Sequence, residues 1–271
     1  MDRYQLTTLA IIFWLLIDSD YPSDTLCDRQ IVKNSKPIFV VKFTLLILSI
    51  TFILTDNTYI YLHGFASSPR SNKASYLRDR FSEVGLDLKV LDLNRGDFSR
   101  LTLTRQIEQT IGAFPDSQTP VVLIGSSFGG LTCAWVAQQK LQVKKMILLA
   151  PAFGFPNSWY SKLQPEQIEQ WRESGYLSVY HYGDKRSIPL HYEFLLDADK
   201  YPVSGLKRFL PTLIIHGVRD DVVPIEVSRN YVDKHPQARL IELASDHGLN
   251  DVKERIWQET KDFLGLSSAR T

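Results

Sequence analysis

The sequence contains little cysteine and almost no net charge, and both shortages exclude classes of protein. Only two cysteines, Cys27 and Cys133, occur among 271 residues, and neither belongs to a Cys-x-x-Cys pair or a Cys/His cluster. A disulfide framework and a structural zinc site are therefore not expected. The 31 basic and 30 acidic residues leave a net charge of +1. No strongly basic face is implied, so nucleic acid is not an expected partner.

The remaining composition is typical of a folded domain. Hydrophobic residues make up 44% of the chain and charged residues 23%, which is an ordinary globular balance. A chain of 271 residues can form one large domain with a substantial core. We found no internal repeat and no low-complexity tract.

A compositional break near residues 55–57 divides the chain into two parts. Before it lie two apolar runs, 6–17 and 37–54, the second interrupted by Lys42. After it, short apolar runs alternate with amphipathic stretches, as in a globular domain. We therefore predict a hydrophobic extension over 1–57 and a globular domain over 58–271.

Three accounts of this extension compete. The first run has the length of a signal peptide but lacks a small-residue cleavage site. The second run is slightly short for a membrane-spanning helix. The third account, which we favour, is a misassigned start, because the globular pattern is complete from Thr58. We expect a cytoplasmic protein for which the extension is dispensable; the alternative is a membrane anchor, and only residues 1–54 would then contact the membrane.

Strands and helices are expected to alternate through the globular domain. The apolar patterns predict strands at 59–62, 86–93, 121–124, 146–149, 212–215 and 239–243, and helices at 74–84, 103–114, 131–139, 226–234 and 251–264. This order favours a mostly parallel sheet with helices on both faces. The aromatic-rich stretch 151–205 interrupts it between two strands. We predict that this insertion is a lid over the carboxyl edge of the sheet, where such folds bind ligands.

The strongest chemical signal is the Gly-x-Ser-x-Gly motif formed by Gly125, Ser127 and Gly129 between an apolar strand and an apolar helix. The glycines permit a strained turn that exposes the serine hydroxyl above the sheet. Phe128 opens the helix, so its N–H is a candidate oxyanion donor. We predict that Ser127 is the nucleophile. Ser126 lacks the flanking glycines and is interpreted as a turn residue.

A base and an acid are expected after the serine, in the order serine, acid, histidine. His247 follows the last predicted strand and is the predicted base. Asp220 and Asp221 follow the strand at 212–215 and compete as the acid. The spacing to Val223 and Pro224 favours Asp220, whereas Asp221 could cap the helix that begins near Pro224.

A second oxyanion donor is expected after the first strand of the domain. Gly64 lets the backbone approach a substrate carbonyl, and the N–H of Phe65 can then donate to it. By itself this segment would be a simple strand-to-helix turn. The nearby predicted triad favours the catalytic interpretation.

Taken together, these motifs resemble the small bacterial YqiA/YcfP-like α/β-hydrolases. The resemblance covers residues 58 to about 264 in order and rests on segments 63–69 (HGFASSP), 73–74 (KA), 92–94 (DLN), 124–130 (IGSSFGG), 149–153 (LAPAF), 216–224 and 246–247. It implies an α/β-hydrolase fold and a carboxylesterase-type activity without a cofactor. It also implies catalytic roles for Ser127, Asp220 and His247. The first 57 residues depart from the family pattern.

We therefore predict a serine esterase that forms an acyl-enzyme with small or medium acyl esters. A thioesterase, an acyltransferase or a peptidase could use the same triad. A non-catalytic relative that binds a small ligand is the alternative from another class, although its usual mark would be a missing triad member. The sequence leaves the natural substrate and the oligomeric state open.

Overall fold

The computed structural model describes residues 57–94, 97–116 and 118–266. Thr55–Thr271 forms one compact unit. The predictions for the hydrophobic extension fall outside the described residues, apart from its last residue. Within the described part of the chain, no helix is long and apolar enough to cross a membrane.

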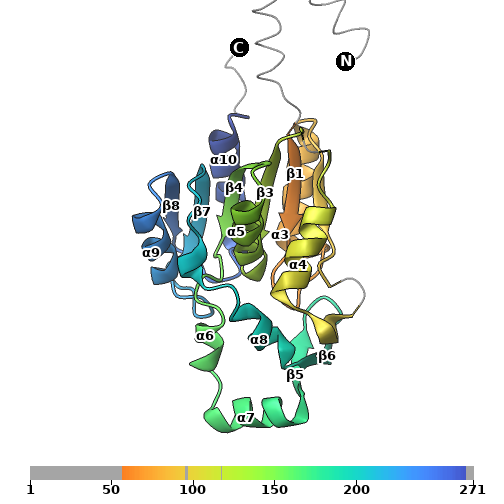
Figure 1. The fold of residues 1–271 in the computed structure, drawn as a ribbon. Coiled ribbons are helices and arrows are strands. Elements are labelled where there is room, and N and C mark those ends of the chain that lie inside the picture. The colour runs from red at the N-terminus through yellow and green to blue at the C-terminus, as the bar shows by residue number, and fades with distance from the viewer. Residues whose placement is uncertain (1–56, 95–96, 117, 267–271) are drawn as a thin grey trace, which may run out of the picture. The chain divides into compact units, whose positions relative to one another are not determined.

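A six-stranded parallel sheet forms the centre of this unit (Figure 1). Its order is β2-β1-β3-β4-β7-β8. The strands are β1 (Thr58–Leu62), β2 (Leu88–Leu91), β3 (Val121–Ser126), β4 (Val143–Leu149), β7 (Thr212–Gly217) and β8 (Ala238–Leu243). Every neighbouring pair runs parallel. All six strands therefore deliver the loops that follow them to one edge, and the predicted parallel sheet is confirmed.

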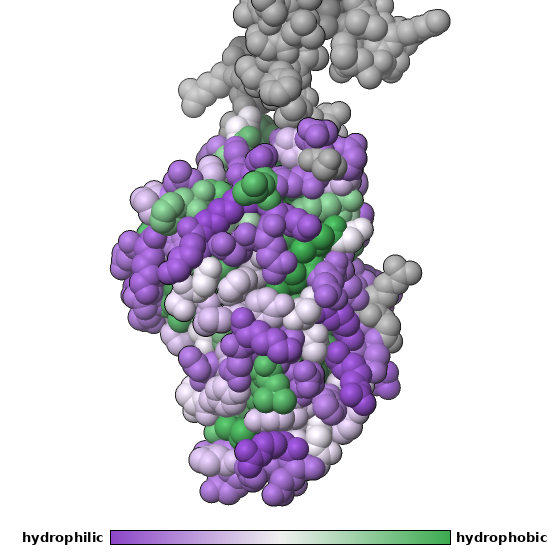
Figure 2. All heavy atoms as spheres, in the orientation of Figure 1, coloured by the Kyte–Doolittle hydropathy of each residue, from purple (hydrophilic) through white to green (hydrophobic). Residues whose placement is uncertain are grey.

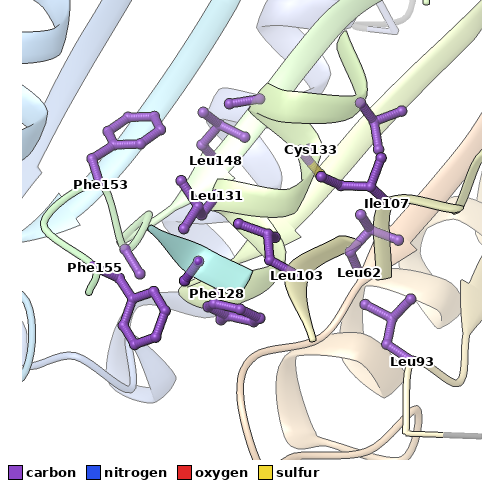
Figure 3. Packing of buried hydrophobic residues seen from close by; sticks show 14 of the residues in the cluster. Leu62, Leu93, Leu103, Ile107, Phe128, Leu131, Cys133, Leu148, Phe153 and Phe155 are labelled. Carbon is purple, nitrogen blue, oxygen red and sulfur yellow. The ribbon is translucent and has the colours of Figure 1, made fainter. Parts of the chain in front are cut away.

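Helices cover both faces of the sheet, because successive strand residues point to opposite sides. Ile60 and Leu123 join one buried cluster, while Tyr61 and Val122 join the other. The first cluster, part of which is drawn in Figure 3, takes in α4 (Leu103–Gly112), α5 (Phe128–Gln139) and α9 (Glu226–Lys234). The second takes in α3 (Asn72–Glu83) and α10 (Lys253–Leu264).

The predicted order of elements holds, with differences at the ends. Helix α5 begins at Phe128, where the Gly-x-Ser-x-Gly motif placed the helix start, although the apolar pattern alone predicted 131–139. Gly129 and Gly130 weaken the helical signal there, because glycine disfavours helix interiors. Helix α9 has the predicted bounds. Three short 3₁₀ turns, η1 (Phe98–Arg100), η2 (Val203–Gly205) and η3 (Asn250–Val252), complete the loops.

The stretch between β4 and β7 inserts a further group of helices and strands into the domain. It contains α6 (Asn157–Tyr160), α7 (Pro165–Ser174), β5 (Tyr176–His181), β6 (Arg186–His191) and α8 (Glu193–Ala198). Strands β5 and β6 pair as an antiparallel hairpin, which the sequence patterns did not predict. In Figure 1 these elements lie together beyond one end of the central sheet. The face of the protein shown in Figure 2 is mostly hydrophilic, with hydrophobic residues in small separate areas.

Candidate active site

The turn between β3 and α5 holds Ser127 in a strained conformation. Its φ and ψ are 54° and −117°, a region that residues with a Cβ rarely adopt. The flanking glycines are required by close approach rather than by their own torsion angles. A Cβ at Gly125 would collide with the carbonyl oxygen of Gly129, and one at Gly129 would collide with the carbonyl oxygen of Leu62. This geometry is the one predicted for a nucleophile elbow.

Hydrogen bonds to neighbouring backbone fix this turn. The N–H of Ser127 donates to the carbonyl of Leu149 at 2.9 Å, and its own carbonyl accepts from Ala152 at 3.0 Å. Ser127 is partly exposed, whereas Ser126 is the buried last residue of β3. Of the two serines, only Ser127 therefore presents a hydroxyl at the edge of the sheet.

His247 connects Ser127 to Asp220. Its Nε2 lies 3.0 Å from Oγ of Ser127, and its Nδ1 lies 2.7 Å from Oδ2 of Asp220. The three residues come from the loops after β3, β7 and β8. The His247 side chain is 21% exposed, while that of Asp220 is completely buried. The structure thus brings together the three residues that the sequence predicted for the triad.

The carboxylate of Asp220 is held by four donors. Oδ1 accepts from the N–H groups of Val222 at 2.9 Å and Val223 at 2.7 Å. Oδ2 accepts from His247 and also from Nε2 of His216 at 3.1 Å. Burial alone would raise the pKa of Asp220, but the hydrogen bonds from His216, His247 and Val223 outweigh it and hold the pKa well below its usual range. Asp220 is therefore ionised at neutral pH.

Asp221, the competing candidate, and Asp246, the neighbour of His247, have other surroundings. Asp221 is exposed, and helix α9 receives no capping bond from a side chain at its start. The predicted helix cap at Asp221 is therefore wrong. The N–H groups of Val222 and Val223, which precede the helix, donate to Asp220 instead. Asp246 accepts from the N–H of Leu249 at 3.1 Å, within its own loop.

The predicted oxyanion donors flank the serine. A Cβ on Gly64 would lie 3.3 Å from the Cβ of Ser127, so the backbone of the loop after β1 passes directly beside the elbow. The N–H of Phe128 is the first of α5, and no carbonyl of the helix can accept from it. Whether the N–H groups of Phe65 and Phe128 bind an oxyanion remains a prediction.

Five aromatic rings gather around this loop and the elbow. They are Phe65, Phe128, Phe155, Trp159 and Phe194, and the centroids of contacting rings lie 5.1–6.4 Å apart. Figure 3 shows Phe128 and Phe155 next to each other. Phe65 lies in the loop after β1 and Phe128 at the elbow, whereas the other three rings belong to the insertion. Aromatic packing therefore connects the insertion to the loops of the site.

Trp171, by contrast, lies within the core of the insertion. It is buried, and its indole N–H donates to the carbonyl of Leu190 at 2.8 Å. The centroid of its ring lies 6.0 Å from that of Trp159 and 5.6 Å from that of Tyr192. The two tryptophans therefore have different surroundings, which the sequence did not distinguish.

Two further residues contact the triad and its loops. His216 is buried between Asp220 and Ser228. Its Nε2 contacts Oδ2 of Asp220, and its Nδ1 lies 2.7 Å from the hydroxyl of Ser228. Lys73, at the start of α3, donates to the carbonyl of Gly248 at 2.8 Å, next to His247. Burial lowers the pKa of Lys73 to about 8, although Asp220 and Asp246 oppose the shift. The contact joins residues 175 positions apart, so no local pattern could reveal it.

No described residues suggest a metal centre. Within the part of the chain that the structure describes, no group of three or more His, Cys, Asp or Glu side chains is arranged to hold an ion. Cys133 is buried and free.

Comparison with known proteins identifies both family and fold. Residues 58–265 match the model described as "Uncharacterised protein family (UPF0227)", which confirms the YqiA/YcfP resemblance. Est1E from Butyrivibrio proteoclasticus, with ferulic acid bound, is 21% identical over 78% of this chain and 88% of its own, with a TM-score of 0.66. The mouse α/β hydrolase domain-containing protein 10 is 21% identical over 78% and 90%, also with a TM-score of 0.66. These likenesses show the α/β-hydrolase fold. No curated protein sequence matches the chain significantly.

Proposed function

The chain belongs to the UPF0227 family, and we propose that it hydrolyses small or medium acyl esters through an acyl-enzyme on Ser127. The observation that carries this proposal is the continuous hydrogen-bonded path from Asp220 through His247 to Ser127, with distances of 2.7 and 3.0 Å. A serine hydroxyl becomes nucleophilic when a base accepts its proton. The strain at Ser127 supports the same conclusion, because such strain concentrates at functional sites.

The residues act in a defined order. His247 Nε2 accepts the hydroxyl proton as Oγ of Ser127 attacks the ester carbonyl carbon. Asp220 accepts a hydrogen bond from Nδ1–H throughout and stabilises the imidazolium. The N–H groups of Phe65 and Phe128 bind the oxygen that becomes negative. His247 then gives its proton to the departing alcohol, and water repeats the sequence to release the acid.

The five aromatic rings near the elbow support the proposal that the substrate carries an apolar acyl group. Phe155, Trp159 and Phe194 belong to the insertion, and their rings pack against Phe65 and Phe128. Apolar side chains beside the reacting serine exclude water and bind acyl chains. The bound ferulic acid of Est1E is consistent with a site of this kind on the same fold.

A panel of p-nitrophenyl esters from acetyl to octanoyl tests the proposal, with acyl thioesters in parallel to compare leaving groups. The Ser127→Ala variant should lose turnover by about a million-fold, because triad members act as one unit. A fluorophosphonate should label Ser127, and Ser126→Ala should still be labelled. Turnover by a Ser127→Ala preparation at the wild-type rate would rule out the serine mechanism.

A further inference from the structure

The loop after β1 is bonded to the hairpin of the insertion. The carbonyl of Ala66 accepts from the N–H of Tyr182 at 2.8 Å and from that of Gly183 at 3.4 Å. Ala66 itself has a φ of 52°, which is unfavourable for a residue with a Cβ and needs support from its surroundings. The turn between β5 and β6 provides part of that support.

Asn94 forms a hydrogen bond with the same loop from the segment after β2. It follows β2, and its side-chain amide donates to the carbonyl of Ser67. The same amide nitrogen lies 2.9 Å from Nε2 of His181, the last residue of β5. Burial lowers the pKa of His181, and Nδ1 of its ring accepts from the N–H of Asp184 at 3.0 Å, within the same turn. One side chain thus bridges the sheet, the loop and the hairpin.

Packing leaves little room for this bridge to shift. A Cβ on Gly183 would lie 2.8 Å from the Cβ of Ser68 and 3.2 Å from the carbonyl oxygen of Ser67. The His181 ring is buried and packs edge-on against the Phe98 ring, with 4.6 Å between the ring centroids. The hairpin therefore sits directly against residues 66–68.

These contacts bear on the direction of the Phe65 N–H. The Gly64 carbonyl accepts from Nδ1 of His63 at 2.9 Å and from the N–H of Ser67 at 3.3 Å. A trans peptide holds its C=O and N–H on opposite sides. Holding the Gly64 carbonyl therefore aims the Phe65 N–H the other way, and Ser67, whose own carbonyl is bound by Asn94, supplies one of the two bonds.

We propose that Asn94 is a positioning residue that, with the β5–β6 turn, fixes the loop 64–67 and so the oxyanion donor at Phe65. This inference rests on the proposed ester hydrolysis. It also makes the insertion part of the catalytic apparatus, since displacement of the hairpin would release the Ala66 carbonyl and the partner of Asn94 together.

The experiment compares Asn94→Ala and Asn94→Asp, with Asn230→Ala as control because Asn230 is an exposed asparagine on α9. A misplaced donor should lower kcat on p-nitrophenyl acetate by about 10- to 100-fold at pH 8 while KM changes less than about twofold. Asn94→Asp should lose more than Asn94→Ala, because its carboxylate oxygen would face the Ser67 carbonyl. A role in packing alone would give the opposite ranking, since aspartate keeps the shape of asparagine.

Hydrogen–deuterium exchange of residues 63–70 gives a readout independent of activity. We expect faster exchange there in Asn94→Ala, with the rest of the domain unchanged. Unchanged exchange in this segment, or kcat equal to that of Asn230→Ala, would overturn the proposal. If wild-type protein hydrolyses no ester, the proposed function fails, and the exchange measurement alone decides whether Asn94 holds the loop.

A second variant covers the case in which Asn94→Ala does not fold. Gly183→Ala keeps Asn94 but pushes the hairpin away from Ser68. It should lower kcat with little change in KM and speed exchange in residues 63–70. If Gly183→Ala matches wild type in both measurements, the hairpin does not position the loop and the proposal is wrong.

Discussion

Replacing Asp220 with asparagine should force His247 into a tautomer that cannot serve as a base. Oδ1 of Asp220 accepts from the N–H groups of Val222 and Val223 at 2.9 and 2.7 Å. In Asp220→Asn only the amide oxygen can take that place, so the amide nitrogen must face Nδ1 of His247. Nδ1 then has to accept, the ring proton moves to Nε2, and Nε2 can no longer take the proton of Ser127.

The expected loss in kcat is about 10⁴-fold, or about 5.5 kcal/mol in the activation free energy, by analogy with other serine triads. Asp221→Asn is the matched control, because Asp221 is the exposed neighbour that competed for the same role. Its kcat should stay within about twofold of wild type, as expected for a surface change away from the reacting groups. Steady-state kinetics on the best p-nitrophenyl ester measures both. An Asp221→Asn variant that loses more activity than Asp220→Asn would refute the assignment of the acid.

Three further predictions follow from the same geometry. Trp159→Ala should alter the preference for acyl chain length in the ester panel, because Trp159 packs against Phe65. Trp171→Ala should leave that preference unchanged. It should instead lower the free energy of unfolding, measured by urea denaturation, by about 3–5 kcal/mol. The folded pKa of Lys73 is about 8, against 10.5 for a free lysine, so the unfolded chain holds the extra proton and stability should rise between pH 8 and 10.5. Relative to Lys73→Met, that rise should reach up to about 3 kcal/mol, and parallel pH curves for the two proteins would contradict it. Residues 56–271 expressed alone should be soluble and keep the specific activity of the full chain, and an insoluble or inactive fragment would show that the extension contributes to the fold.

Much of the central sheet could be predicted because its inner strands are buried on both faces. Such strands form short continuous apolar runs between turn residues, and β3 and β7 are buried along their whole length. The elbow was recognisable because Gly125 and Gly129 are required by backbone contacts that any sequence with this turn must accommodate. In these cases a local pattern carried the structural cause.

The hairpin in the insertion was not predicted because its apolar residues do not follow burial. In β5, Leu177 and Val179 are partly buried, but the tyrosines on either side of this pair are exposed, Tyr176 by 40% and Tyr180 by 49%. The expected alternation of apolar and polar residues is therefore lost. Pro189 lies within β6 and is normally evidence against a strand; a two-stranded hairpin tolerates it because both of its strands are edges.

The supporting contacts of the site could not be predicted for a different reason: each depends on which strand ends are neighbours. The order β2-β1-β3 places the segment after β1 between the segments after β2 and β3. Gly64 can therefore reach Ser127 on one side, while Ser67 reaches Asn94 on the other. A different strand order with the same six sequences would separate these residues, although every local motif would be unchanged. The motifs consequently predict the reacting groups, whereas the strand order determines which side chains lie around them.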